Sequence, residues 1–399
     1  MKKRLFGILA VTLILLPLAV YFFTSWNVRS HAQVALSRAQ RLLAERQPDK
    51  ALDELHWLVW FEPDQPLANL IAGECYFVKQ QYLEAIPRLS RFDTASPHYL
   101  RASYALARSY ENTAQMEQAE RVLKQHLKLF PDSQEAVTEL QWLYFNQFRL
   151  RELQVLLEHS LDYCPNKFLL LYHLLNTEHK KPIAQESIRT LNRINELRPD
   201  QASIIRAIGY CHWKLGDIEQ AKAFIAAARQ LQPEDLEATL IAVEFYLELG
   251  EMDTLENLIA DIKNQSTTFQ KQLKQDDRWL WLLSRLELQT GETAAALKSI
   301  QEASRLKAKQ IQYLQQEAMI LQALGHKAES TSKFQEARTL ASSHRELYKI
   351  VSSGALESPT VELGNQILVH LETLGYQKQA NAWRELVQQF QSLQRTSSP

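Results

Sequence analysis

Histidine and cysteine are the residue types that most often bind metal ions or act as nucleophiles, and this chain has 11 and 3 of them. No His-Glu-x-x-His motif or other zinc-binding spacing occurs. The sequence also lacks Gly-x-Gly-x-x-Gly, P-loop and Gly-x-Ser-x-Gly motifs, and its 10 glycines leave little room for a phosphate-binding loop. Cys75, Cys164 and Cys211 are predicted to be small packing residues. We therefore expect no catalytic residue, no metal site and no cofactor.

The other chemistry available to the chain is recognition of a partner by arginine, aromatic and asparagine side chains, which alternate between residues 101 and 213. Aromatic and arginine side chains anchor many protein interfaces. An arginine can pair with a carboxylate through two hydrogen bonds, and an asparagine can bond both amide groups of an extended peptide. These side chains form a surface only if regular elements place them on one face.

Composition limits what those elements can be. The 45 Lys and Arg residues nearly balance the 46 Asp and Glu residues, giving a net charge of −1, so the chain lacks the basic field that nucleic-acid binding requires. Apolar residues make up 46% and charged residues 23% of the 399 residues, which is typical of a folded protein. The few glycines favour helices over the many turns of a β-sandwich or barrel.

Six of the 13 prolines lie 34 residues apart, at 63, 97, 131, 165, 199 and 233. Small residues recur in the same phase, as in Ala51, Ala85 and Ala119, and so do large aliphatic ones. Glycines 216 and 250, and then 291 and 325, continue the spacing after an insertion near residues 270–276. A Ser/Gly/Pro loop, residues 352–359, precedes a last degenerate unit.

This spacing resembles the tetratricopeptide repeat, a pair of antiparallel helices that recurs every 34 residues. The resemblance implies an all-α fold, a right-handed α-solenoid of about ten helix hairpins with a concave face lined by the first helix of each pair. We expect seven repeats over residues 32–269, two over 277–344 and a degenerate capping hairpin over 361–394.

Five positions of each first helix fall on one face, and in repeats 3 to 6 that face predicts a partner-binding groove. An ordinary solvated helix face is the alternative. The groove residues are Arg101, Tyr104, Arg108 and Asn112 in repeat 3, Trp142 and Asn146 in repeat 4, Tyr172 and Asn176 in repeat 5, and Arg206, Tyr210 and Trp213 in repeat 6. In repeat 7 the same face becomes acidic, and in repeat 8 it becomes basic again.

The N-terminus predicts a membrane anchor. Lys2, Lys3 and Arg4 precede an uncharged run over residues 5–23, and 19 residues of helix span roughly 28 Å, close to the hydrocarbon core of a bilayer. The charges predict a cytoplasmic N-terminus, residues 1–4, and a solenoid on the opposite side of the bacterial inner membrane. A cleaved signal peptide is the competing interpretation, and a cytoplasmic solenoid remains an alternative.

Together these features predict a membrane-anchored scaffold or adaptor, not an enzyme, that takes part in assembling envelope complexes. Its expected partners are extended or helical segments of other proteins, acidic ones included, and not nucleic acid. The alternatives are a catalytic or non-catalytic subunit of an envelope enzyme or export complex, a secreted repeat protein and a structural spacer.

Overall fold

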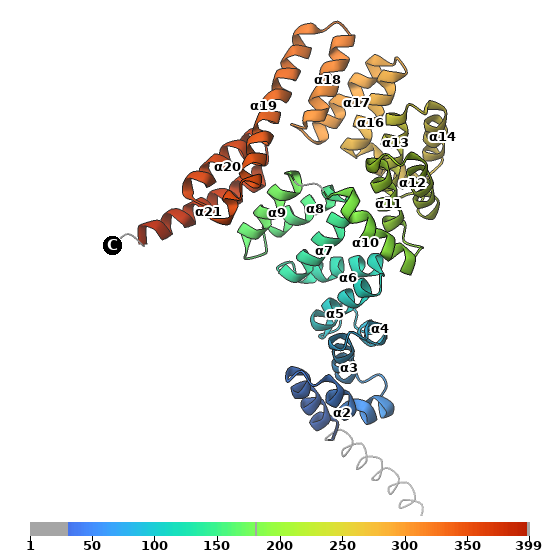
Figure 1. Ribbon diagram of the computed structural model, residues 1–399, viewed down its shortest axis with the longest axis vertical. Coiled ribbons are helices and arrows are strands. Elements are labelled where there is room, and N and C mark those ends of the chain that lie inside the picture. The colour runs from blue at the N-terminus through green and yellow to red at the C-terminus, as the bar shows by residue number, and fades with distance from the viewer. Residues whose placement is uncertain (1–30, 180–181, 397–399) are drawn as a thin grey trace, which may run out of the picture. The chain divides into compact units, whose positions relative to one another are not determined.

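The computed structural model describes residues 31–179 and 182–396, which contain helices and no strand. The chain divides into two compact units, Met1–Phe130 and Pro131–Pro399. In unit 1, residues 31–44 are helical and are followed by α2 (Pro48–Phe61), α3 (Pro66–Val78), α4 (Tyr82–Leu89), α5 (Tyr99–Asn112) and α6 (Met116–Leu129). The expected all-α class is confirmed, and each unit is a solenoid-like stack of helices (Figure 1).

Unit 2 holds the remaining helices, joined mostly by short turns. They are α7 (Gln134–Asn146), α8 (Leu150–Ser160), α9 (Lys167–His179), α10 (Ala184–Leu197), α11 (Ala202–Leu215), α12 (Ile218–Leu231), α13 (Leu236–Leu249), α14 (Met252–Lys263), α15 (Thr267–Lys274), α16 (Asp277–Gln289), α17 (Thr293–Leu306), α18 (Ile311–Ala323), α19 (Lys327–Ser352), α20 (Val361–Leu374) and α21 (Gln377–Thr396). The short helix α15 occupies the part of the chain where the sequence predicts an insertion. The division into ten repeats, with its boundaries, stays a prediction.

The turn between paired helices has one recurring backbone feature, a residue with positive φ. In the first four hairpins this residue is not glycine, and in the described turns that follow α11, α13, α16, α18 and α20 it is glycine. The non-glycine residues are Arg46, Gln80, Ala114 and Phe148, with φ between 57° and 60°, and Gly216, Gly250, Gly291, Gly325 and Gly375 follow, with φ between 71° and 84°. A left-handed residue ends a helix because it lets the next amide bond back to the last helical turn.

The repeated small and aliphatic residues form the core between the helices. Ala51, Ala85 and Ala119 are completely buried, and an alanine at such a crossing lets two helix backbones approach closely. The aliphatic residues four positions later are also buried. These residues are Leu55, Leu89, Leu123, Leu157, Leu191 and Ile225. Several of these residues, among them Leu55, Leu89 and Ile225, belong to hydrophobic clusters between consecutive helices, as expected for stacked hairpins.

The membrane helix predicted for residues 5–23 lies outside the described residues. Over residues 31–179 and 182–396, no helix combines the length and the apolar composition needed to cross a bilayer.

Candidate partner-binding surfaces

In unit 1, the predicted groove residues lie on α5, where salt bridges already engage both arginines. Arg101 donates two hydrogen bonds to the carboxylate of Glu74 on α3, at 3.1 and 2.7 Å. Burial raises the pKa of Glu74, and the neighbouring Arg101 only partly offsets this effect. Arg108 pairs with Glu111 one turn along the same helix, at 3.1 Å. Because Arg101 itself is exposed, a partner carboxylate can reach it by competing with Glu74.

The three predicted asparagines bind their own helices. The side-chain nitrogen of Asn112 donates to the carbonyl of Arg108 at 2.7 Å. Asn146 and Asn176 make the same contact with the residues four positions earlier, at 2.8 Å in each case. Asparagine near a helix end commonly makes this local bond, which spacing on a helical face does not reveal. In this structure their amide donors are thus directed to the helix backbone.

In unit 2, the predicted residues differ sharply in accessibility. Trp142 is 42% exposed on α7, whereas Tyr172 and Tyr210 are half-buried. Arg206 and Trp213 are only 3% and 7% exposed, so the expectation that they line an open groove is not met in this structure. The reason is packing between neighbouring helices. Trp213 meets Phe245 of α13 edge-on, with ring centroids 5.5 Å apart.

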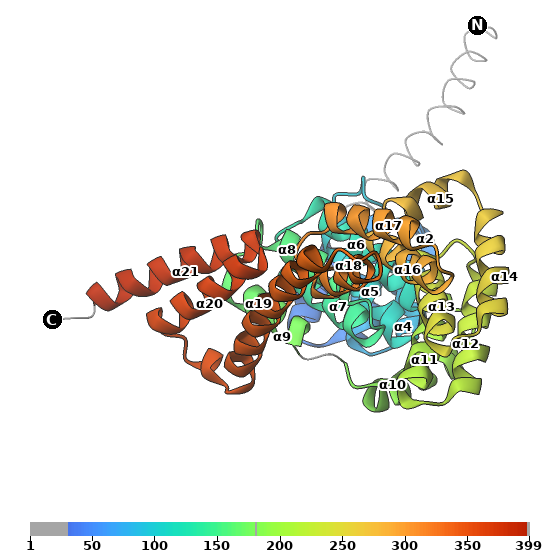
Figure 2. The same cartoon turned by 90° about the horizontal axis from the view of Figure 1, so that it is seen from above.

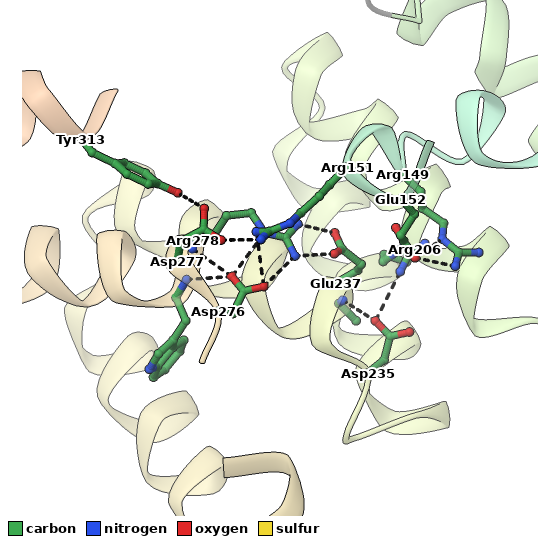
Figure 3. Close-up of polar contacts among 12 residues, drawn as sticks. Arg149, Arg151, Glu152, Arg206, Asp235, Glu237, Asp276, Asp277, Arg278 and Tyr313 are labelled. Atoms are coloured by element: carbon green, nitrogen blue, oxygen red, sulfur yellow. Dashed lines mark hydrogen bonds and ion pairs between the residues drawn. The ribbon is translucent and has the colours of Figure 1, made fainter. Parts of the chain in front are cut away.

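The buried guanidinium of Arg206 belongs to an ionic network on α8, α11, α13 and α16 (Figure 3). Arg206 lies 3.3 Å from Asp235, just before α13. On α16, Arg278 donates to both oxygens of Glu237, at 2.9 and 2.6 Å, and also contacts Asp276 at 3.1 Å. Although burial disfavours its charge, Glu237 has a lowered pKa because Arg278 and, more weakly, Arg206 stabilise the carboxylate.

One ion pair of this network joins helices far apart in the sequence. Arg151 on α8 lies 2.5 Å from Asp277, the first residue of α16. The hydroxyl of Tyr313, on α18, donates to the other oxygen of Asp277 at 2.7 Å. Burial opposes ionisation of Asp277, but the Tyr313 hydrogen bond and Arg151 outweigh it, so the pKa of Asp277 is lowered. A cavity of about 230 Å³ adjoins these residues and is also lined by Lys307 and Gln310.

Part of the change of sign along the predicted groove is matched by ion pairs inside unit 2. Glu237, on the acidic face of α13, pairs with Arg278 of α16, and Asp235, just before α13, pairs with the buried Arg206 of α11. Aromatic side chains hold other cations nearer the surface. The exposed Lys214 ammonium lies 3.3 Å from the centroid of the Trp213 ring, and the Arg285 guanidinium lies 5.0 Å from that of Trp281.

The structure also shows the surroundings of the cysteine, serine and histidine side chains that could act as nucleophiles, bases or metal ligands. Burial raises the pKa of Cys75 and of Cys211 to about 12, so both thiols stay protonated at neutral pH. Ser103 and His126 are 2.7 Å apart, but each is at most 2% exposed and cannot contact a substrate. Within the described part of the chain, no three His, Cys, Asp or Glu side chains gather as metal ligands would.

One group of contacts was not foreseen from the sequence. The C-terminal hairpin α20–α21 returns to α8 and α9, where Trp383 is completely buried and lies edge-on to Phe168. Two ion pairs flank this contact, Lys378 with Asp162 and Lys167 with Glu385, each at 2.6 Å. The sequence offers one signal for this contact, which is Trp383 in the predicted capping hairpin. A capping hairpin usually has a polar outer face, so a large apolar side chain there indicates a further contact.

Two segments of this chain are similar to a known repeat family. Tetratricopeptide repeat models match residues 79–141 and 207–235. No curated protein matches the chain. Among solved structures, MamA from Desulfovibrio magneticus RS-1, solved from its residue 41 to its end, is 15% identical, with 45% of this chain and 97% of that chain covered and a TM-score of 0.34. Yeast Tom70 is 13% identical, with 93% and 97% covered and a TM-score of 0.31.

The human IFIT1 dimer with PPP-AAAA is 14% identical, with 76% of this chain and 89% of IFIT1 covered and a TM-score of 0.33. One matched segment lies wholly in unit 2, and the other begins in unit 1 and ends in unit 2. The chain is therefore similar to the tetratricopeptide repeat family over these two segments.

Proposed function

We propose that this chain is a non-catalytic scaffold that binds segments of other proteins through the first helices of its repeats. The observation that carries this proposal is the presence of tetratricopeptide repeats, a binding scaffold, together with cationic and aromatic side chains on those helices. Exposed Arg101 and half-buried Tyr104 and Arg108 share one face of α5 in unit 1. The most accessible aromatic of the predicted groove in unit 2 is Trp142.

The partner chemistry that suits α5 is an acidic segment. Each arginine of this face already holds a glutamate, so a carboxylate from a partner meets guanidinium groups that are oriented for bidentate pairing. A partner carboxylate at Arg101 must compete with Glu74, because the Arg101 guanidinium partly offsets the burial of that glutamate's charge. The buried Arg206 is no longer part of the proposed surface.

The scaffold is further proposed to be held at the bacterial inner membrane by residues 5–23, with its repeats in the periplasm, where it would serve the assembly of envelope complexes. The uncharged run and the preceding Lys2, Lys3 and Arg4 support this location. Anchoring would raise the local concentration of the scaffold around membrane-bound partners. Alkaline phosphatase fused after Pro399 tests the topology, since an inactive, cytoplasmic fusion would contradict it.

A pull-down from membranes tests the binding surface. Arg101→Glu/Arg108→Glu should abolish capture of partners that the unmodified chain retains, because both cations become repulsive to acidic segments. Arg121→Glu/Lys128→Glu makes the same charge change on α6, the second helix of the same hairpin, and should leave capture unchanged. Equal capture by both variants would reject the α5 surface, and equal loss would show a non-specific effect of net charge.

A further inference from the structure

The C-terminal hairpin α20–α21 contacts helices that lie far back along the chain. In a simple solenoid each repeat touches only its neighbours. Here α9 packs against both α19 and α21, and these helices lie side by side in two perpendicular views (Figures 1 and 2). The acceptor surface, which we call the α8–α9 face, consists of Glu158, Asp162, Lys167 and Phe168.

The contact has an apolar centre and a polar rim that fixes its direction. Trp383 is the centre, completely buried against Phe168. The ion pairs on its two sides have opposite polarity. The hairpin supplies the cation to Asp162 through Lys378, and it supplies the anion to Lys167 through Glu385. Reversing the direction of α21 would therefore place like charges together, so the pattern specifies one orientation.

The connection between α19 and the hairpin is a short segment in which Leu356 is buried and most other residues are exposed. A short 3₁₀ turn, Ala355–Glu357, and exposed residues around Pro359 join α19 to α20. The eight residues 353–360 can span about 26 Å when extended.

The hairpin has further attachments to unit 2. Helix α20 packs against α19, and Tyr376 lies edge-on to His344 of α19. The Lys309 ammonium donates a hydrogen bond of 2.8 Å to the Thr373 carbonyl. In an exchanged dimer these contacts must also re-form between the two copies.

Opening this contact is also less unfavourable than its buried tryptophan suggests. The side chains of the two ion pairs are between 34% and 55% exposed, and such pairs contribute about 0–1 kcal/mol each. Among the described residues, the Trp383 indole N–H has no hydrogen-bond acceptor although it is buried. An unsatisfied buried donor weakens a contact.

We propose that the α8–α9 face is also the docking site for the α20–α21 hairpin of a second copy of this chain, so that two scaffolds join by reciprocal exchange. A second copy carries the same tryptophan, lysine and glutamate, so every contact made within one chain re-forms between two. Exchange of an identical element thus requires no new interface. The tether favours the intramolecular contact with an effective concentration on the order of millimolar, so exchange increases with local concentration.

A pair of full-length charge-reversal variants tests this proposal. The face variant carries Asp162→Lys/Lys167→Glu, and the hairpin variant carries Lys378→Glu/Glu385→Lys. Each variant alone has two repulsive contacts within its chain. In a mixture, the face of each variant matches the hairpin of the other. The quadruple variant, which restores both pairs within one chain, is the control for folding.

We expect the mixture to form a 1:1 heterodimer, at twice the 46.2 kDa mass of the chain in light scattering. Its dimer fraction should exceed that of either variant alone by about tenfold, as expected for two ion pairs of this exposure. Limited proteolysis near Pro359 should be fast in each variant alone and slow in the mixture and in the quadruple variant. Two monomers with exposed hairpins in the mixture would overturn exchange, as would protected hairpins in the separate variants. Capture of a different protein by the vacated face, in place of the second copy, would overturn this choice of occupant.

Discussion

The two units use similar helix hairpins but are held together differently. In unit 1, the main contacts join neighbouring helices, and the ion pairs lie within one helix or join hairpins that follow one another, as in Lys79 with Asp49 and Arg101 with Glu74. In unit 2, ion pairs also connect segments more than 100 residues apart, as in Arg151 with Asp277 and Lys378 with Asp162. The same repeat can therefore build a purely local stack or one that closes on itself.

This difference has a thermodynamic consequence. A stack with neighbour contacts behaves as a one-dimensional chain, in which a weakened repeat affects mainly the adjacent ones. Contacts between α9 and α21 couple the fifth hairpin of the chain to its last helices. We therefore expect damage to spread along the sequence in unit 2 and to stay local in unit 1.

The largest expected effect comes from removing the tryptophan at the centre of the C-terminal contact. Trp383→Ala should destabilise unit 2 by about 3–5 kcal/mol, because it leaves a cavity at a completely buried site. Hydrogen exchange should accelerate in α9 as well as in α20 and α21. Leu55→Ala, at a similarly buried site in unit 1, should accelerate exchange only in the neighbouring helices. If hydrogen exchange in α9 stays unchanged, the expected spread of destabilisation in unit 2, and with it this difference from unit 1, would be contradicted.

Arg151→Ala should have the next largest effect, since it leaves the buried carboxylate of Asp277 without its cation. We expect a loss of about 2–3 kcal/mol, below the value for a fully buried pair because the Arg151 side chain is 34% exposed. The folded-state pKa of Asp277 is lower than the unfolded value of about 3.9, so its stabilising effect is present at neutral pH. It is lost as the pH falls below about 4. Denaturant unfolding across this pH range should show a weaker acid dependence in the variant.

The turn residues predict effects of opposite sign in the two units. Gly250→Ala in unit 2 should cost about 1–2 kcal/mol, because φ is 71° there while the space around a new Cβ is open. Gln80→Gly in unit 1 should stabilise by about 1 kcal/mol, because its φ of 60° is unfavourable for a residue with a side chain. Thermal unfolding measures both changes. Destabilisation by Gln80→Gly would show that the side chain contributes more than its backbone strain.

The smallest expected effect is that of Arg101→Ala in unit 1, at most about 1 kcal/mol, because the pair with Glu74 lies near the surface. Its pH dependence has the opposite sign to that of Asp277. Burial raises the pKa of Glu74 above its unfolded value, so stability decreases as the pH rises through that raised pKa. Loss of Arg101 should enlarge this decrease in urea unfolding. An enhanced acid sensitivity instead would contradict the assigned direction.

The sequence was sufficient to predict the helical class and the periodic core. Residues such as Leu55, Leu123 and Ala119 recur at fixed positions because each hairpin buries the same stripe against the next. Glycines at 216 and 250 indicated turns because a left-handed residue follows the first helix of each pair. Because these hairpins have the same buried stripe and the same type of turn, these residues recur periodically in the sequence.

The accessibility of the predicted groove could not be obtained in the same way. The position of a residue in the repeat predicts the side of the helix from which its side chain projects. The packing of the neighbouring helix decides whether that side chain is buried or exposed. Arg206 and Trp213 are buried for this reason, whereas Arg101 is exposed. Contacts such as Lys378 with Asp162 leave no periodic pattern at all, because they join two single residues 216 positions apart.

The most direct test of closure in unit 2 is zero-length carbodiimide cross-linking of the full chain at low concentration, followed by peptide mass spectrometry. This chemistry joins an amine to a carboxylate only when the two are in contact. The structure predicts cross-links of Lys378 with Asp162 and of Lys167 with Glu385 in monomers or exchanged dimers, alongside the local pair Lys79 and Asp49. Recovery of the local pair without either C-terminal pair would contradict the account.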